Sequence, residues 1–413
     1  MRENRMSKPH RSLLKSSIAA AAVAALLVPG ASLAQAKTVK APSGAAFYKA
    51  PAKLIKGKPG TIIWSRTIPY TANGRVAPFN SGKTMLVLYR SRSITGKPIA
   101  VSGTIDVPKG TPPAGGWKMV SWAHGTTGAA DVCAPSRTAP GTPADGYIAY
   151  ADATVNGWLG DGYAVLRTDF EGLGTPGPHP YLIGASEGRG VVDIASAAKS
   201  MLGSKVSSDW VIGGHSQGGQ SALFAASLAK KLAPKLKLKG VFAYAPASNI
   251  ALQRVLIPSL GDAYKGLSGI AVLILNSAAQ QAKVKTASLV NPGPAALLPQ
   301  IEKVCLSQLG SAEMFGQWAP KDILKPGIKT PAIDAVIKAM NPDVKIDVPV
   351  MILQGKSDTT VLPYLTDRLV EKAVNLPEGV DYRKFDGLTH TTIVTDPAPD
   401  AAALGFIQAH FGQ

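Results

Sequence analysis

The sequence predicts an α/β fold in which helices cover both faces of a mostly parallel β-sheet. From residue 118 to residue 246, and again after residue 347, apolar strand-like runs alternate with helix-forming segments, a rhythm typical of doubly wound sheets. One such run, Trp210–Gly213, passes through a glycine-rich turn into a strong helix former that begins at Ser221. The polar motifs of the chain follow the strand-like runs directly, where parallel sheets place their ligand sites.

Residues 1–36 have the pattern of a secretory signal peptide. A basic front with five Lys/Arg precedes the eleven-residue apolar run Ile18–Val28, and Ala34-Gln35-Ala36 supplies a small-x-small cleavage site. The apolar run is too short to span a bilayer, and we see no later run of transmembrane length. The sequence therefore predicts a secreted or periplasmic protein that is cleaved near Ala36.

The remaining chain divides into four predicted parts. Residues 37–60 read as a loosely structured lead-in, residues 61–246 as the first part of the α/β core, and residues 347–413 as its second part. Within the core, three β-type runs at 61–70, 84–91 and 99–108 are expected to form an antiparallel edge. Residues 247–346 lack a strand rhythm and contain many prolines, which predicts a helical insertion placed as a cap over the strand ends. The alternative is a structural subdomain with no contact to substrate.

The formal charge of +18 leaves +14 after the leader, whose five Lys/Arg and Glu3 carry a net +4. Excess basic charge is typical of proteins that meet nucleic acid or anionic surfaces. Here the lysines are scattered without interleaved aromatic residues, and no nucleic-acid-binding motif accompanies them. We therefore expect a solvated basic surface that makes peripheral contact with lipid or an anionic envelope, and no nucleic-acid partner.

The chain has two cysteines, Cys133 and Cys305. In an exported protein such a pair predicts one disulfide, and two unpaired buried thiols are the alternative. Neither cysteine has a second cysteine or a histidine at ligand spacing, so no metal site is predicted.

The motif Gly214-His215-Ser216-Gln217-Gly218 is the centre of the predicted chemistry. A serine on a sharp turn between a strand and a helix is typical of a nucleophile elbow, because small flanking residues let strand and helix approach closely. The alternative is a glycine-rich turn with a surface serine. We predict that Ser216 is a catalytic nucleophile.

A serine nucleophile needs a base and an acid, which follow it in this order along such chains. His390 lies in the loop after the predicted strand 380–385, whereas His410 falls in an apolar terminal helix. Asp358 lies in the loop after the strand that ends at Leu353, and Asp386 is the second choice. The predicted triad is Ser216, Asp358 and His390.

An oxyanion hole requires two backbone N–H groups that point at the position of the oxyanion. Gln217, directly after the nucleophile, is expected to supply one, and Thr126 in the motif His124-Gly-Thr-Thr-Gly is expected to supply the other. We expect His124 to brace this turn and His215 to pack or hydrogen-bond beneath the elbow. In the loop 168–181, Asp169 and Glu171 either touch substrate or fix the loop through its backbone amides.

Three motifs together resemble the secretory lipase family of α/β-hydrolases, which includes the fungal lipase A enzymes. They are Trp-Ala-His-Gly-Thr-Thr-Gly at 122–128, Asp-Phe-Glu-Gly-Leu-Gly-Thr-Pro-Gly-Pro-His-Pro-Tyr at 169–181, and Gly-His-Ser-Gln-Gly-Gly at 214–219. The resemblance covers most of the mature chain, which reads as a bacterial-looking secreted member. It implies the α/β-hydrolase fold and a serine ester hydrolase that needs no metal or organic cofactor.

The residues and the resemblance together predict an exported lipase or esterase whose substrates are esters, with triacylglycerols the leading class. Aryl-ester, feruloyl-ester or polyester hydrolysis and peptide hydrolysis use the same triad and stay open. A peptidase of the aminopeptidase kind would need an acidic pair for the substrate amine, which we do not find. A binding protein on an inactive hydrolase scaffold is disfavoured because all three triad members are present.

Overall fold

The computed structural model describes residues 40–68, 80–138, 141–142, 144–256, 261–328, 330–372 and 379–412. The predicted signal peptide, residues 1–36, lies outside the described residues.

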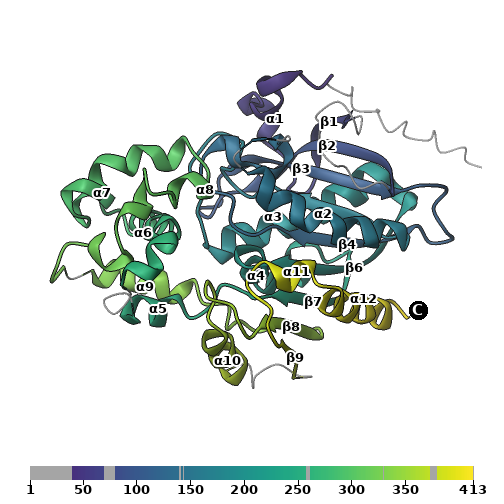
Figure 1. Cartoon of the computed structure of the whole chain (residues 1–413). Helices are drawn as coiled ribbons and strands as arrows, with labels where there is room; N and C mark the ends of the chain where they lie inside the picture. The colour runs from purple at the N-terminus through teal and green to yellow at the C-terminus, as the bar shows by residue number, and fades with distance from the viewer. Residues whose placement is uncertain are drawn as a thin grey trace, which may run out of the picture. The chain divides into compact units, whose positions relative to one another are not determined.

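A nine-stranded sheet forms the centre of the described chain (Figure 1). The strands run in the order β1-β2-β3-β5-β4-β6-β7-β8-β9, and the last six in this order are parallel. The strands are β1 (Ile62–Ile68), β2 (Ser81–Arg92), β3 (Pro98–Pro108), β4 (Trp117–Ala123), β5 (Ala164–Thr168), β6 (Val206–His215), β7 (Lys237–Tyr244), β8 (Val350–Gly355) and β9 (Val380–Phe385). The mostly parallel sheet that the sequence predicts is confirmed.

The three N-terminal strands pair antiparallel with one another, and β3 also joins β5 antiparallel, as expected for the sheet edge. The segment expected to be a loose lead-in contains two short helices, η1 (Gly44–Tyr48) and α1 (Ala52–Ile55). Phe47 and Tyr48 are buried there against Trp64 and Leu88. This segment is therefore anchored by two aromatic side chains, which its three prolines did not suggest.

Helices cover both faces of the sheet, which agrees with the nearly continuous burial of strands such as β4, β5 and β8. In β4, Met119 faces the cluster formed with α3 and α4, whereas Val120 faces the cluster formed with α2, α11 and α12. The helices of the core outside the segment between β7 and β8 are α2 (Asp145–Gly160), α3 (Gly184–Leu202), α4 (Gln217–Leu232), α10 (Pro363–Lys372), α11 (Thr392–Thr395) and α12 (Pro397–Phe411). Short 3₁₀ turns η2 (Asp131–Cys133), η3 (Pro135–Arg137) and η4 (Gly203–Lys205) lie in the connections.

The chain between β7 and β8 forms helices with a hydrophobic core of their own. This core includes Val272, Leu273, Ile333 and Ile337. Tyr181, from the loop between β5 and α3, also packs in it. The helices are α5 (Ile250–Leu256), α6 (Ser268–Gln281), α7 (Pro292–Leu297), α8 (Leu306–Leu309) and α9 (Pro331–Ala339), with η6 (Asp262–Leu267), η7 (Thr286–Ser288), η8 (Leu298–Glu302), η9 (Phe315–Gln317) and η10 (Pro320–Asp322). We call residues 247–346 the helical insertion.

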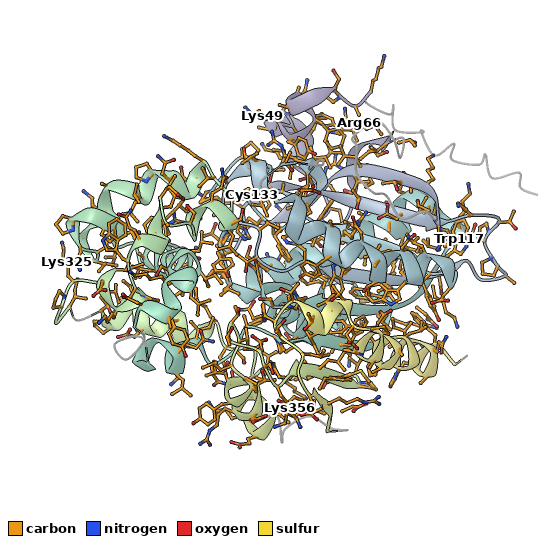
Figure 2. All side chains as sticks on the ribbon, viewed as in Figure 1. Lys49, Arg66, Trp117, Cys133, Lys325 and Lys356 are labelled. Atoms are coloured by element: carbon orange, nitrogen blue, oxygen red, sulfur yellow. A yellow bond between two sulfur atoms is a disulfide. The ribbon has the colours of Figure 1, made fainter. Side chains whose placement is uncertain are left out.

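The predicted disulfide between Cys133 and Cys305 is present, and both residues are fully buried. Cys133 lies where the helical insertion meets the core (Figure 2). The bond joins positions 172 residues apart in the sequence. It therefore ties the helical insertion to the segment that follows β4.

Lysines are spread over the exterior of the described residues. Lys49, Lys325 and Lys356 are exposed examples that lie far from one another (Figure 2). None of the helices within the described ranges is both long and apolar enough to cross a membrane.

Candidate active site

Ser216 is the single residue that connects β6, which ends at His215, to α4, which begins at Gln217. Its backbone has φ 57° and ψ −117°, a conformation that side-chain-bearing residues rarely adopt. The glycines on either side make the turn possible. A Cβ on Gly214 would lie 2.1 Å from the carbonyl oxygen of Gly218, and a Cβ on Gly218 would lie 1.9 Å from that of Ala123. The turn therefore has the geometry of a nucleophile elbow.

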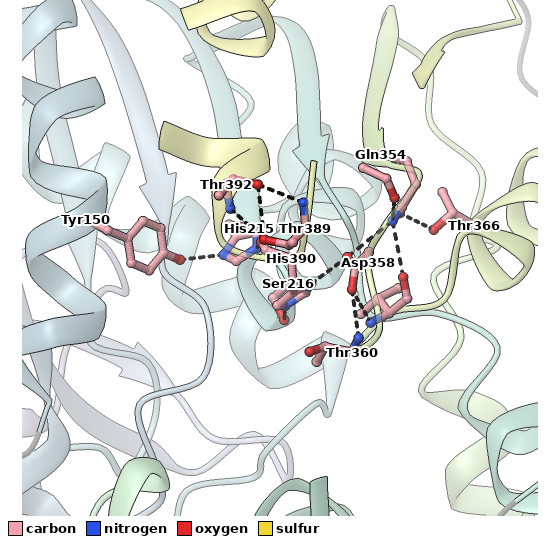
Figure 3. A network of polar contacts seen from close by, with 12 residues as sticks. Tyr150, His215, Ser216, Gln354, Asp358, Thr360, Thr366, Thr389, His390 and Thr392 are labelled. Carbon is pink, nitrogen blue, oxygen red and sulfur yellow. Dashed lines mark hydrogen bonds and ion pairs between the residues drawn. The ribbon is translucent and has the colours of Figure 1, made fainter. Parts of the chain in front are cut away.

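His390 meets this serine from the loop between β9 and α11. Its Nε2 lies 2.9 Å from the Ser216 hydroxyl oxygen (Figure 3). The imidazole is partly exposed, with 15% of the side chain accessible. An imidazole at this distance can accept the hydroxyl proton as the oxygen attacks.

Asp358 is hydrogen-bonded to the second ring nitrogen of His390. Its Oδ2 accepts a 2.7 Å hydrogen bond from His390 Nδ1, which leaves Nε2 unprotonated and facing the serine. Its Oδ1 accepts the backbone N–H groups of Thr360 and Val361 at 2.8 and 2.9 Å. The Gln354 amide adds a 3.2 Å bond to Oδ2 (Figure 3). The buried carboxylate is thus fixed from three directions and bonded to the histidine.

The second-choice residues lie elsewhere. Asp386 is exposed and pairs with Lys356 at 2.8 Å. His410 Nδ1 contacts the Phe406 carbonyl oxygen at 2.8 Å within α12, as expected of a residue near a helix end. Neither side chain contacts the Ser216–His390 pair.

His215 forms hydrogen bonds beneath the elbow, as the sequence predicted without naming their partners. Its Nε2 donates to the carbonyl oxygen of His390 at 2.9 Å, and its Nδ1 accepts a 2.5 Å bond from the Tyr150 hydroxyl. Burial is the main cause that lowers the pKa of His215 well below its usual value, and the nearby His390 imidazole lowers it further. The His215 ring is therefore neutral. The contribution of Tyr150, a residue of α2, has no signal in the sequence.

The two expected oxyanion donors come from adjoining loops. The Gln217 N–H belongs to the first residue of α4, where a backbone N–H has no acceptor within the helix. Thr126 lies in the loop after β4, and its hydroxyl meets the Tyr181 hydroxyl at 2.7 Å. His124 Nδ1 faces the Gly125 carbonyl oxygen at 2.7 Å, which agrees with the bracing expected of this residue.

The acidic residues of the loop 168–181 hold loops in place. Asp169 accepts the Ser102 hydroxyl at 2.6 Å and the backbone N–H of Ser136 at 2.8 Å. Glu171 accepts the backbone N–H of Ile94 at 3.2 Å and the Ser186 hydroxyl. Of the two roles considered for these carboxylates, the contacts match loop fixation.

An apolar pocket adjoins the loop that carries Asp358. Its wall on that side is made by Thr359, Thr360 and Leu362, and the remainder comes from the helical insertion. The insertion side includes Tyr264, Leu267, Ile270, Ala271, Ile274 and Leu275. Among the residues that the structure describes, no group of three or more His, Cys, Asp or Glu side chains is placed to hold a metal ion.

Comparison with known proteins finds a family model and several relatives. The model described as "Secretory lipase" matches residues 144–412. Lipase 6 of Candida albicans is 26% identical over 397 residues, covering 91% of this chain and 82% of its own length. Secreted triacylglycerol lipase LIP4 of Malassezia globosa is 27% identical over 333 residues, covering 77% of this chain and 70% of its own length.

Solved structures share the fold. Candida antarctica lipase A in its closed state superposes with a TM-score of 0.72 at 21% identity, covering 90% of this chain and 87% of that one. The rice cell wall degrading esterase LipA of Xanthomonas oryzae gives a TM-score of 0.66 at 16% identity, covering 86% of this chain and 100% of that one. These similarities establish the α/β-hydrolase architecture of the chain.

Proposed function

Since this chain belongs to the secretory lipase family, we propose that it hydrolyses lipid esters with Ser216 as nucleophile, His390 as general base and Asp358 as the orienting acid. The observation that carries the proposal is the pair of hydrogen bonds through His390, 2.9 Å to Ser216 Oγ and 2.7 Å to Asp358 Oδ2. Such a relay raises the nucleophilicity of a serine at neutral pH.

In the proposed reaction, Ser216 Oγ attacks the ester carbonyl carbon while His390 Nε2 takes the hydroxyl proton. The carbonyl oxygen becomes an oxyanion that accepts the N–H groups of Gln217 and Thr126. His390 then gives its proton to the leaving alcohol, and the acyl group stays on the serine. A water molecule then attacks the acyl carbon while the same imidazole takes its proton, and His390 returns this proton to Ser216 Oγ as the acyl–serine bond breaks and the carboxylic acid leaves.

We assign the acyl chain to the apolar pocket of the helical insertion. Most of its lining residues are aliphatic, and it begins at Thr359 and Thr360, next to Asp358. An aliphatic chain gains about 0.8 kcal/mol for each methylene group that it removes from water. The insertion then serves as the cap that selects the ester. No metal or organic cofactor takes part in the proposed steps.

We further propose that the protein is exported and acts on lipid outside the cytoplasm. The support is the leader pattern of residues 1–36, the family description and the disulfide. The scattered lysines, net +14 after the leader, favour peripheral contact with anionic lipid or envelope polymers.

The test is Ser216→Ala, with hydrolysis of p-nitrophenyl butyrate and of emulsified triglyceride as readouts. Loss of the nucleophile is expected to lower kcat by about 10⁴-fold or more while the folded structure persists. A serine-directed phosphonate is expected to label the wild type at one site per chain and to leave the variant unlabelled. Full activity of Ser216→Ala, or a wild type inactive on every ester, would contradict the proposal.

A further inference from the structure

Glu187 is a buried carboxylate beneath the nucleophile elbow that takes no part in the relay. It belongs to the first turn of α3, and its side chain is fully buried. It accepts hydrogen bonds from the Gln217 side-chain amide at 2.7 Å, from the Leu182 backbone N–H at 2.8 Å and from the Ser221 hydroxyl. Each carboxylate oxygen therefore has at least one donor.

The Gln217 amide is fixed at a second point by His179. The Nδ1 atom of His179 faces the Glu171 carbonyl oxygen at 2.8 Å and must carry the ring proton, so Nε2 is an acceptor. Gln217 Nε2 donates to that acceptor at 3.0 Å. Burial lowers the pKa of His179 to about 4, which keeps the ring neutral. Both amide hydrogens of Gln217 are therefore used, and its side chain has one orientation.

The same carboxylate is linked indirectly, through the segment of Tyr181 and Leu182, to the other expected oxyanion residue. Glu187 accepts the backbone N–H of Leu182, the residue after Tyr181. The Tyr181 hydroxyl in turn lies 2.7 Å from Thr126 Oγ1. Leu182 has a φ of 58°, a conformation that needs such an anchor in a residue with a branched side chain. Glu187 thus bonds directly to the Gln217 side chain at the start of α4 and to the Leu182 backbone, whose neighbour Tyr181 contacts Thr126.

We propose that Glu187 is a positioning residue that holds the Gln217 and Thr126 backbone N–H groups at the spacing an oxyanion requires. This inference rests on the proposed function, since it concerns the stabilisation of the tetrahedral intermediate. An oxyanion hole works only if its donors are fixed before charge develops, so the residue that fixes them affects kcat rather than substrate binding.

The polarity of the buried Glu187 carboxyl supports a positioning role over a merely space-filling one. Burial raises the pKa of this carboxyl to about 7, against the effect of its three hydrogen bonds. A buried carboxyl is costly compared with an apolar side chain of the same size, so stability alone does not account for its presence. Two carboxylate oxygens can instead accept several N–H and O–H groups from separate segments at once.

The test is Glu187→Gln, which keeps the shape but replaces one acceptor oxygen with a donor. We expect kcat for p-nitrophenyl butyrate to fall about 10- to 100-fold per active site, less than the loss typical of removing an oxyanion donor outright. KM is expected to stay within about two-fold of the wild type, because the ground-state carbonyl is not yet charged. The inhibition constant of butaneboronic acid, which forms a tetrahedral adduct on serine, is expected to rise by the same factor as kcat falls.

Active-site titration with a p-nitrophenyl phosphonate, read at its stoichiometric endpoint, counts only folded enzyme. The matched control is Asp193→Asn, another buried carboxylate of α3 with a raised pKa, which accepts the Ser91 hydroxyl at 2.6 Å. It is expected to lower stability and to leave kcat and boronate inhibition per active site unchanged. If Glu187→Gln does not fold, Gln217→Met keeps the backbone N–H, removes both side-chain anchors, and is expected to show the same paired loss.

The inference is overturned if Glu187→Gln, or Gln217→Met in its place, keeps the wild-type kcat and boronate affinity per titrated site. In that outcome the wild type still hydrolyses esters, so the proposed function stands. A wild type without esterase activity would overturn the proposed function instead, and the two failures are therefore distinguishable. An equal loss in Asp193→Asn would also count against a specific role for Glu187.

Discussion

Leu306 of the helical insertion donates its backbone N–H to the carbonyl oxygen of Thr127 at 2.8 Å. Beside this bond, Gly128 pairs with Cys305 in an isolated β-bridge, and Cys305 is disulfide-bonded to Cys133. The helical insertion is thus fastened to the loop that follows β4. The contacts of Thr127 and Gly128 lie directly beyond Thr126, the expected oxyanion residue of that loop.

The double variant Cys133→Ser/Cys305→Ser is expected to lower the free energy of unfolding by about 2–4 kcal/mol, because the bond closes a long loop in the unfolded chain. We also expect kcat to fall, since the loop after β4 loses a fixed point. Guanidinium unfolding followed by fluorescence measures the first effect, and ester hydrolysis well below the transition measures the second. An unchanged denaturation midpoint would contradict the expected stabilisation.

Asp358→Asn is expected to lower kcat by about 10⁴-fold with little change in KM, because an amide cannot hold His390 in the tautomer that accepts the serine proton. The readout is the steady-state rate on a soluble ester. The matched control is Asp386→Asn, which removes a carboxylate that is exposed and paired with Lys356. Equal effects of the two variants would show that the acid has been assigned to the wrong loop.

Much of the fold and the relay could be predicted because their signals are local in sequence. Ser216 and Asp358 each follow a strand with an apolar run within a few residues, and His390 follows β9, in which apolar and polar residues are mixed. Strand ends that are neighbours in a parallel sheet bring such loops together. Pattern and topology were therefore enough to place these three residues near one another.

The supporting residues could not be predicted, because their contacts join segments with no shared pattern. Tyr150 reaches His215 across 65 positions, and Glu187 reaches Gln217 across 30. A tyrosine or glutamate within a helix-forming segment looks the same in sequence whether it faces solvent or a buried partner. Such contacts depend on how α2 and α3 pack on the sheet, which only the structure shows.

His124 is expected to make stability fall in mild acid. Burial lowers its pKa to about 4, with the neighbouring His179 adding to the shift, whereas the unfolded chain has the usual value of 6.5. The unfolded state therefore binds the extra proton first, and the contribution of neutral His124 is present above pH 6.5 and lost as pH falls toward 4. By pH 5 this loss amounts to about 2 kcal/mol.

The measurement compares urea unfolding of the wild type and His124→Asn at pH 7.5 and pH 5. The stability difference between the two proteins is expected to shrink by about 2 kcal/mol at the lower pH, since asparagine does not titrate. Glu187 shifts in the opposite direction, because its raised pKa favours the folded state as pH falls, but it is common to both proteins and cancels. A difference independent of pH would rule out a buried neutral His124.

Ala271→Trp is expected to shorten the acyl chain that the enzyme prefers. Ala271 lies on α6 in the wall of the apolar pocket, so an indole there would occupy space assigned to the hydrocarbon chain. Rates on p-nitrophenyl esters from acetate to palmitate, together with emulsified triolein and a feruloyl ester, define the profile. We expect kcat/KM for long chains to fall about ten-fold or more while acetate is unaffected, because each excluded methylene forfeits about 0.8 kcal/mol.

The matched control for this substitution is Gln280→Trp, an exposed position on the same helix. It adds the same side chain without entering the pocket, and its chain-length profile is expected to match that of the wild type. If Ala271→Trp also leaves the profile unchanged, the acyl chain binds elsewhere and the helical insertion does not select the ester. If the wild type prefers the feruloyl ester to every aliphatic ester, the apolar pocket accommodates an aryl group and the triacylglycerol assignment is wrong.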